Sequence, residues 1–240
     1  MRIDSSKCTA CGTCVPVCPM AAIELEDIAI IDQSECVDCG VCFRSDACPV
    51  DAIEQETPDW PRSLRAVFSD PTMSHSQTNI PGRGTEEMKT NDVTGVFRAG
   101  IVGIGLEFGR PGIGTRFRDV ALVAKAMARE GAQFRPENPV TFLMTDTAAG
   151  ELREDILDEK VLSAIIEFTV PIGSMKSVLQ TLREVSSRVD TVFSVECISV
   201  VEADGSVPLD QILTDLGIAH YPNGKTNLGL GRLPDQGGRR

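Results

Sequence analysis

The chain has 240 residues, of which 42% are hydrophobic, and a formal net charge of −12. This length allows one or two domains, and the hydrophobic content is enough for a packed core. The acidic balance argues against nucleic acid, because proteins that bind it usually carry a basic surface. No apolar run reaches the roughly 18 residues that a membrane-spanning helix needs, and the start "MRIDSSKC" has no apolar export segment. We therefore expect a cytoplasmic protein that binds no nucleic acid and does not span a membrane.

The charge is concentrated at the amino-terminal end. Residues 1–57 hold eleven Asp and Glu against three Lys and Arg, a net charge of −8, which leaves −4 for the other 183 residues. An acidic segment of this kind favours approach to a basic surface on a protein partner.

Cysteine is also concentrated there, since eight of the nine cysteines lie in the first 48 residues. In a secreted protein this density would indicate disulfides, but no export segment is apparent. A reducing compartment would leave the thiolates free to bind metal.

The first 53 residues contain a repeat. The segment "IDSSKCTACGTC" (3–14) aligns with "IDQSECVDCGVC" (31–42) at an offset of 28, and "CPMAAI" (18–23) aligns with "CPVDAI" (48–53) at an offset of 30. A unit this short buries little apolar area, so something other than a hydrophobic core must stabilise it. Metal clusters would do so.

The spacing of the thiols favours iron–sulfur clusters. The first run is C-x2-C-x2-C-x3-C-P and the second is C-x2-C-x2-C-x5-C-P. Three cysteines at steps of three can each bind one iron of a cubane, and Gly12 and Gly40 permit the tight turn between them. The fourth cysteine lies beyond the turn, and in this pattern it ligates the other cluster. Cys36, Cys39 and Cys42 would then serve one site and Cys48 its neighbour.

Residues 1–57 resemble the bacterial two-cluster [4Fe–4S] ferredoxins through these two runs. The resemblance implies two clusters, each with four thiolate ligands. It assigns Cys8, Cys11, Cys14 and Cys48 to the first cluster, and Cys36, Cys39, Cys42 and Cys18 to the second.

One departure from that family is the x5 spacing before Cys48, where its plain form has x3. The extra residues, within "FRSDA" (43–47), would lengthen a loop beside a cluster and change its potential through hydrogen bonding and solvent access. Two zinc sites of four thiolates are the alternative, but zinc modules use CxxC pairs about 12–20 residues apart. Disulfides are a further alternative.

Residues 58–95 read as an irregular linker or docking arm. Four prolines, at 58, 61, 71 and 81, interrupt the segment, and no period of 2 or 3.6 persists. With Trp60 and Phe68 present, we expect an ordered arm that lies on the protein or on a partner. His75 reads as a solvated loop histidine, with a ligand or catalytic role as the alternative.

Regular structure is predicted again in residues 96–221. Strands are expected at 101–108, 139–144, 162–170 and 191–201, and helices at 115–131 and 174–189. Thr115 is a candidate N-cap of the first helix, Gly131 is a candidate C′ residue, and residues 145–161 form a polar, partly helical excursion. The order predicts an α+β fold, in which a two-cluster ferredoxin module precedes a βαββαβ domain with an antiparallel sheet covered on one face by two helices.

The segment "EFGRPGIGTRFRDVALVAKAMAREGAQF" (107–134) resembles the start of an ACT domain, which has this ferredoxin-like βαββαβ layout. The resemblance implies that the turn at residues 110–114 contacts a small effector such as an amino acid, and that the domain can form oligomers. The alternative is that Gly109, Gly112 and Gly114 only satisfy a tight turn.

Other motifs carry no prediction of chemistry. The "GKT" in "PNGKTN" (222–227) lacks the first glycine of a phosphate-binding loop, and residues 222–240 read as a Gly-rich tail. Cys197 reads as a buried small hydrophobe rather than a ligand. We find no nucleophile–base pair or paired carboxylates, so no bond-making active site is predicted.

Three functions are compatible with these patterns. The first is electron transfer through two [4Fe–4S] clusters, as the ferredoxin-like subunit of a larger cytoplasmic oxidoreductase complex whose catalytic subunit carries a flavin or a metal and a basic docking surface. The second is a redox- or metabolite-sensing regulator with an ACT-like effector site. The third makes the clusters purely structural. We favour the first, because the paired cysteine runs are its most specific signal.

Overall fold

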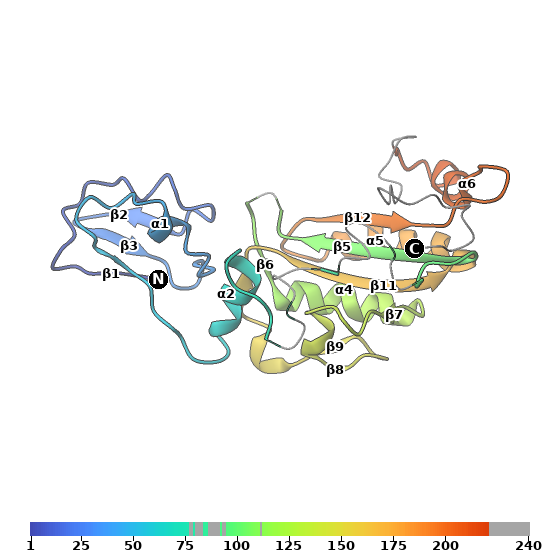
Figure 1. Cartoon of the computed structure of the whole chain (residues 1–240), viewed down its shortest axis with the longest axis horizontal. Coiled ribbons are helices and arrows are strands. Elements are labelled where there is room, and N and C mark those ends of the chain that lie inside the picture. The colour runs from blue at the N-terminus through green and yellow to red at the C-terminus, as the bar shows by residue number, and fades with distance from the viewer. Residues whose placement is uncertain (77–78, 80–83, 86–91, 93–94, 111, 221–240) are drawn as a thin grey trace.

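The computed structural model describes residues 1–220 except 77–78, 80–83, 86–91, 93–94 and 111. The cysteine-rich module lies at one end of the molecule and a larger helix-and-sheet body at the other (Figure 1). Two separate hydrophobic clusters correspond to these parts: one lies within residues 1–53 and reaches Leu162, and the other extends from Leu64 to Ile218.

The module is built from two short antiparallel pairs and one short helix. Strand β1 (Arg2–Ile3) pairs with β4 (Ile53–Glu54), and β2 (Ile23–Leu25) pairs with β3 (Ala29–Ile31). Helix α1 (Val41–Arg44) forms in the second cysteine run. The two extra residues of that run therefore lie in and after a helical turn, where a longer loop was expected.

The segment after the module contains a helix that the sequence reading missed. Helix α2 (Ser63–Ser69) buries Leu64 and Phe68 in the larger core, where the Phe68 ring meets Phe117 edge-on with centroids 5.2 Å apart. The prediction of an arm without regular structure was therefore wrong for this stretch. The periodicity escaped notice because one helix of seven residues is too short to repeat it.

The larger body is a four-stranded antiparallel sheet in the order β12-β5-β11-β7. Its strands are β5 (Ile101–Phe108), β7 (Gln133–Phe134), β11 (Ala164–Pro171) and β12 (Phe193–Ile198). Helix α4 (Phe117–Arg129) joins β5 to β7, and α5 (Met175–Ser186) joins β11 to β12.

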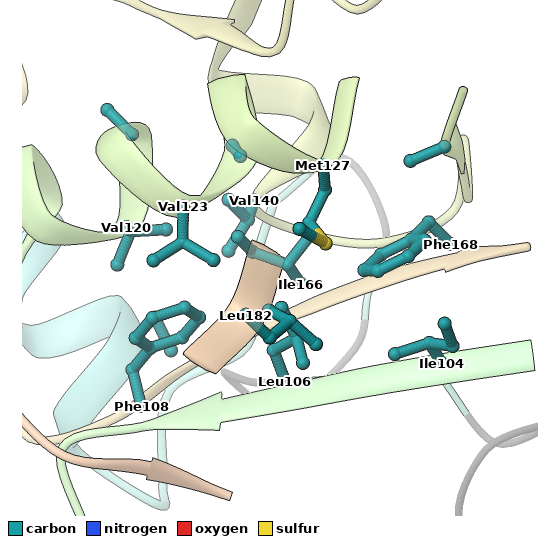
Figure 2. Packing of buried hydrophobic residues seen from close by; sticks show 14 of the residues in the cluster. Ile104, Leu106, Phe108, Val120, Val123, Met127, Val140, Ile166, Phe168 and Leu182 are labelled. Carbon is teal, nitrogen blue, oxygen red and sulfur yellow. The ribbon is translucent and has the colours of Figure 1, made fainter. Parts of the chain in front are cut away.

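Helices α4 and α5 pack against each other and against the sheet, and the core lies between these layers. Alternate residues of the central strands are less than 2% exposed, as their period of two predicts. Figure 2 shows Ile104, Leu106 and Phe108 of β5 and Ile166 and Phe168 of β11 beneath α4. The predicted inward faces of these two strands are confirmed.

The opposite face of the sheet is covered in part by the chain that precedes it. Gly103 lies against the Phe97 ring, where a Cβ would be 2.1 Å from Cε1. The buried Glu167 carboxylate accepts hydrogen bonds from the Thr85 amide at 2.8 and 2.9 Å and from Asn138 Nδ2 at 2.8 Å. Part of the 58–95 segment thus lies on the protein, as expected.

The prediction of a strand at residues 139–144 was wrong. That stretch holds a 3₁₀ turn, η1 (Thr141–Leu143), and only its last residue begins β8 (Met144–Asp146), which pairs with β9 (Glu151–Leu152). Pro139 has no N–H for a sheet, and the Asn138 side chain accepts the Val140 N–H at 2.8 Å.

Several boundaries also differ from the prediction. Thr115 belongs to strand β6 (Thr115–Arg116), which pairs with β10 (Lys160–Val161), so Arg116 rather than Thr115 is the N-cap of α4. Gly131 does end that helix, with φ of 83° and its N–H on the Ala128 carbonyl at 3.0 Å. The remaining turns are η2 (Glu154–Ile156) and η3 (Ile172–Ser174).

The end of the described chain holds helix α6 (Pro208–Asp215), which the sequence reading did not predict. The Gly-rich tail at 222–240, with its "GKT", lies outside the described residues. No helix in the described part of the chain combines the length and apolar character needed to cross a bilayer.

A pair of glycine substitutions tests the approach of the β8–β9 turn to α4. Both Gly150 and Gly205 have positive φ, but only at Gly150 would a Cβ meet fixed backbone, 2.5 Å from the Ala124 carbonyl oxygen; at Gly205 nothing lies within 4 Å. We expect Gly205→Ala to cost about 1 kcal/mol from backbone strain, and Gly150→Ala to cost roughly 1–3 kcal/mol more. Urea unfolding measures both, and equal midpoints would contradict this packing.

Candidate metal centre

Two hollows lie inside the amino-terminal module, and cysteines line both. They enclose about 330 and 290 Å³ that protein atoms do not fill, including their open mouths. The cysteines of the smaller hollow are Cys8, Cys11, Cys14 and Cys48, and those of the larger are Cys18, Cys36, Cys39 and Cys42. Each hollow thus receives three thiols from one run and the last thiol of the other. We call the smaller one, lined by Cys8, Cys11, Cys14 and Cys48, the first hollow, and the larger one the second hollow.

Backbone conformation repeats between the two runs and aims the thiols inward. Gly12 and Gly40 have φ of 73° and 69°, so the prediction that they permit a tight turn is confirmed. Ala10 and Asp38, two residues before them, are also left-handed, with φ of 56° and 51°. Non-glycine residues adopt this conformation rarely. Its occurrence at equivalent positions shows that the repeat in sequence is a repeat in structure.

Backbone N–H groups point at three of the sulfurs. The Ala22 amide donates to Cys18 Sγ at 3.3 Å, and the equivalent Ala52 amide donates to Cys48 Sγ at 3.1 Å. A third amide, that of Ala29, lies 3.5 Å from Cys8 Sγ. Such donors stabilise negative charge on sulfur, which is one way a protein sets the potential of an iron–sulfur cluster.

The thiols differ in exposure and in pKa. Burial raises the pKa of Cys14, Cys36 and Cys39, and it raises that of Cys42 to about 11, with neighbouring thiols adding to the effect. Cys11 is exposed, and hydrogen bonds from Thr13 lower its pKa. Buried thiols of this kind ionise only beside a compensating positive charge, and a bound metal supplies it.

The dimensions of the hollows fit a cluster better than a single ion. One tetrahedral zinc with Zn–S bonds of about 2.3 Å would hold four sulfurs in mutual contact. Within the described residues, no three or more His, Cys, Asp or Glu side chains are gathered closely enough for one ion. The rest of each lining is mostly apolar, so the hollows suit an inorganic core that thiolates hold at its corners.

The two hollows have unequal surroundings, because arginine side chains form hydrogen bonds to the loop that carries the cysteines of the second hollow. Arg65 is 7% exposed, and its Nη1 donates to the carbonyls of Cys36 at 2.7 Å and Gln33 at 2.8 Å. Arg62 bonds Asp38 at 3.0 Å, and Arg44 donates to the Cys39 carbonyl at 2.6 Å.

Further contacts secure the same loop to the larger body. Glu35 pairs with Arg116 at 2.8 Å and with Lys160, and Arg44 pairs with the buried Asp70 at 2.6 Å. Near the first hollow, by contrast, the ion pairs found among the described residues stay within the module; they join Arg2 and Lys7 to Asp4, Glu54 and Glu56. The second hollow therefore faces the larger body, and the first hollow faces away from it.

Comparison with known proteins agrees with this location. Residues 1–24 match the family model described as "4Fe-4S binding domain". The match supports an iron–sulfur domain of the ferredoxin type at the amino-terminal end of the chain. Searches of curated proteins and of solved structures found no match. The match covers the first cysteine run, and it gives no support to the resemblance of residues 96–221 to ACT domains.

The turn at residues 110–114, where the ACT resemblance implied an effector contact, packs against the module. A Cβ at Gly114 would lie 2.7 Å from Cε of Met20, and one at Gly112 would lie 3.6 Å from the Pro19 carbonyl oxygen. Pro19 and Met20 follow Cys18 and line the second hollow. The described glycines of this turn, which all have positive φ, therefore allow the larger body to approach that hollow closely. Pro111 lies outside the described residues.

Two single residues can also be placed. His75 is 7% exposed, burial lowers its pKa, and its ring lies 5.6 Å from that of Phe142, so the prediction of a solvated histidine was wrong. Cys197 lies outside both hollows and packs against the main core, and burial raises its pKa to about 11.

The sequence reading missed the arginines that hold the second hollow. Arg62 and Arg65 lie in a segment read as irregular, and nothing in their local pattern indicates a partner some thirty residues earlier. The one available signal is the excess of acid in residues 1–57, since buried carboxylates such as Asp38 need basic partners.

Replacing Arg65 tests how strongly this grip stabilises the module. Arg65→Met would leave two carbonyls and the Glu159 carboxylate without their buried donor. We expect a loss of about 3–5 kcal/mol, as for other broken buried ion pairs. The matched control is Arg118→Met, which removes an exposed pair with Asp158 and should change stability by about 0.5 kcal/mol or less. Urea unfolding followed by visible absorbance measures both, and equal midpoints would refute the proposed role.

Proposed function

We propose that this chain transfers electrons through two [4Fe–4S] clusters, one in each hollow, as a subunit of a larger cytoplasmic oxidoreductase complex. The observation that carries the proposal is the pair of thiol-lined apolar hollows, each with three cysteines of one run and one of the other. Each bound cluster would take up and release one electron at a time. The ligands we assign are Cys8, Cys11, Cys14 and Cys48 for the first cluster, and Cys36, Cys39, Cys42 and Cys18 for the second.

Each proposed cluster takes its fourth ligand from the other cysteine run, and this crossing supports electron transfer between the two sites. Cys14 and Cys18 are four residues apart and line different hollows. A segment that short holds the two hollows close together, since a fully extended residue spans at most about 3.6 Å. The apolar walls exclude water from the path, and the amides on Cys18 and Cys48 stabilise the thiolate charge where the path crosses.

The larger body supports a fixed place in a complex. A freely diffusing carrier needs only residues 1–57, whereas here the loop of the second hollow is held by buried contacts to the rest of the chain. We assign residues 58–95 to an arm, 96–221 to a βαββαβ domain and 222–240 to a tail. The strand order β12-β5-β11-β7 supports that layout for the domain.

The surface beside the first hollow suits the basic partner that we propose. Leu25 lies beside Gly12 and Val50 lines the hollow, and they are 46% and 37% exposed. Exposed acids neighbour both in sequence; they are Glu24, Glu26, Asp27, Asp46 and Asp51. An apolar centre with a charged rim is the usual composition of a protein interface. The partner would be a catalytic subunit that carries a flavin or a metal.

Pairs of cysteine substitutions test the number of clusters and the ligand exchange together. The intact chain should hold about eight irons and should bleach and recover its visible absorbance through a cycle of dithionite and air. Cys14→Ser with Cys48→Ser removes two ligands of one cluster and should leave about four irons. Cys42→Ser with Cys48→Ser removes a ligand from each and should leave close to none.

If Cys14→Ser with Cys48→Ser left close to no iron, and Cys42→Ser with Cys48→Ser left about four irons, each run would bind its own cluster. Cys197→Ser, which changes a thiol outside both hollows, is the control and should keep the full iron content. A chain that holds iron but does not cycle with dithionite would overturn electron transfer.

Charge reversal tests the docking surface. Glu26→Lys with Asp27→Lys should slow the reduction of cytochrome c, a basic one-electron acceptor, roughly 3- to 10-fold at low salt, and the difference should shrink as salt is added. The control is Glu184→Lys with Glu202→Lys, two exposed acids of the larger body. Equal slowing by both variants would place the docking surface elsewhere.

A further inference from the structure

A third hollow lies in the larger body and has no part in binding the clusters. It contains about 1030 Å³ of space including its mouth, and it opens between the start of α2 and the turn at Phe142. Its lining includes the rings of Trp60, His75 and Phe142, the thioether of Met73 and the guanidinium of Arg153. Pockets of this size and aromatic content are typical of small-molecule sites.

The Trp60 ring is held in one orientation although it is 46% exposed. Its Nε1 donates to Asp155 Oδ2 at 2.6 Å, and the Arg153 guanidinium lies 4.8 Å from the ring centroid. Arg153 is fixed in turn by two hydrogen bonds to Asp155, at 2.8 and 3.0 Å. An exposed indole would otherwise lose side-chain freedom when it orders on a ligand, so this one is prepared for stacking.

A second exposed ring adds to the lining. Phe142 is 45% exposed, and the buried His75 lies against it with ring centroids 5.6 Å apart. Trp60 and Phe142 are among the most exposed large hydrophobic side chains of the described residues, yet both line this hollow. Aromatic surface left open in a hollow is best covered by another flat ring.

The position of α2 relates this hollow to the second cluster site. Ser63, Leu64 and Val67 of that helix line the aromatic hollow, while Arg65 of the same helix bonds the carbonyl of Cys36. An α-helix with its side chains is about 10–12 Å wide. One short helix therefore separates a ligand in the aromatic hollow from the loop that carries Cys36.

We propose that the aromatic hollow binds a planar conjugated redox molecule, of the flavin or quinone class, which exchanges electrons with the neighbouring cluster site. This proposal rests on the proposed electron-transfer function. The ring would stack between Trp60 and Phe142, and the serine hydroxyls at 63, 74 and 76 would meet its polar edge. Full reduction of such a ring takes two electrons, delivered singly from the reduced chain, and two protons, which enter from water through the open mouth.

The sole tryptophan of the chain gives a direct test, because Trp60 emission reports on this hollow alone. Titrating the intact, cluster-loaded protein with riboflavin 5′-phosphate or with menadione should quench that emission saturably, with equilibrium dialysis as a second measure. Phe142→Ala and Arg153→Gln should each weaken binding at least tenfold. Phe43→Ala, an exposed phenylalanine of the module, should leave binding unchanged.

Three outcomes would overturn the proposal: neither probe binds, the variants bind as tightly as the native chain, or adenosine, a flat ring without redox chemistry, binds as tightly as the probes. Iron content and dithionite reduction, measured on the same samples, report on the proposed function separately. Binding of a probe to a chain that holds no iron would sink the electron-transfer function while leaving the hollow a ring-binding site.

Discussion

The module depends on one constraint, which is that eight thiols must be held around two spaces that no side chain fills. A segment of some 55 residues exposes too much of its surface to be stabilised by apolar burial alone. Its small core is made partly of the cysteines themselves, with Cys14, Cys36, Cys39 and Cys42 buried. Thiols packed this closely resist ionisation, because the thiolates would be buried and would repel one another. A positively charged inorganic core would remove both costs at once, and folding of the module would then be coupled to metal binding.

The duplicated runs are equivalent in conformation but not in environment, and the difference comes from the larger body. Arg65 of helix α2 binds the carbonyl of Cys36. Arg44 of the module, which is anchored by Asp70, binds that of Cys39. Both arginines thus hold backbone rather than particular side chains. Contacts of this kind fix the peptide groups around the second hollow and add positive charge beside it. The first hollow has exposed Cys11 and an acidic rim instead. The electron path that we propose would therefore have two distinct ends, one toward solvent and one toward the body.

The sequence predicted those elements that depend on residues close together in the chain. It did not predict elements that depend on partners far away in the sequence. Gly12 and Gly40 predict a local turn, and apolar residues at every second position of 101–108 predict a strand with one buried face. Both predictions depend only on neighbours in the chain. Strand β7 has two residues and exists because it pairs with β11, which no local period reveals. Likewise Arg65 is indistinguishable in sequence from a surface arginine, because its partners Gln33 and Cys36 are brought to it by the fold. The packing of the 110–114 turn against the module could not be predicted for the same reason, since Met20 lies against it only after folding.

Helix α2 contacts the main core, the loop of the second hollow and the aromatic hollow. Because the helix is short, it depends on these contacts. Seven residues are too few to form a stable helix in water, so tertiary contacts must maintain it. Those contacts reach three regions: Leu64 and Phe68 enter the main core, Arg65 binds the loop of the second hollow, and Leu64 and Val67 line the aromatic hollow. Loss of order in the cysteine loop would release the partners of Arg65 and remove part of what keeps the helix folded. The shape of the aromatic hollow therefore depends on the integrity of the module, although no residue of the module lines it.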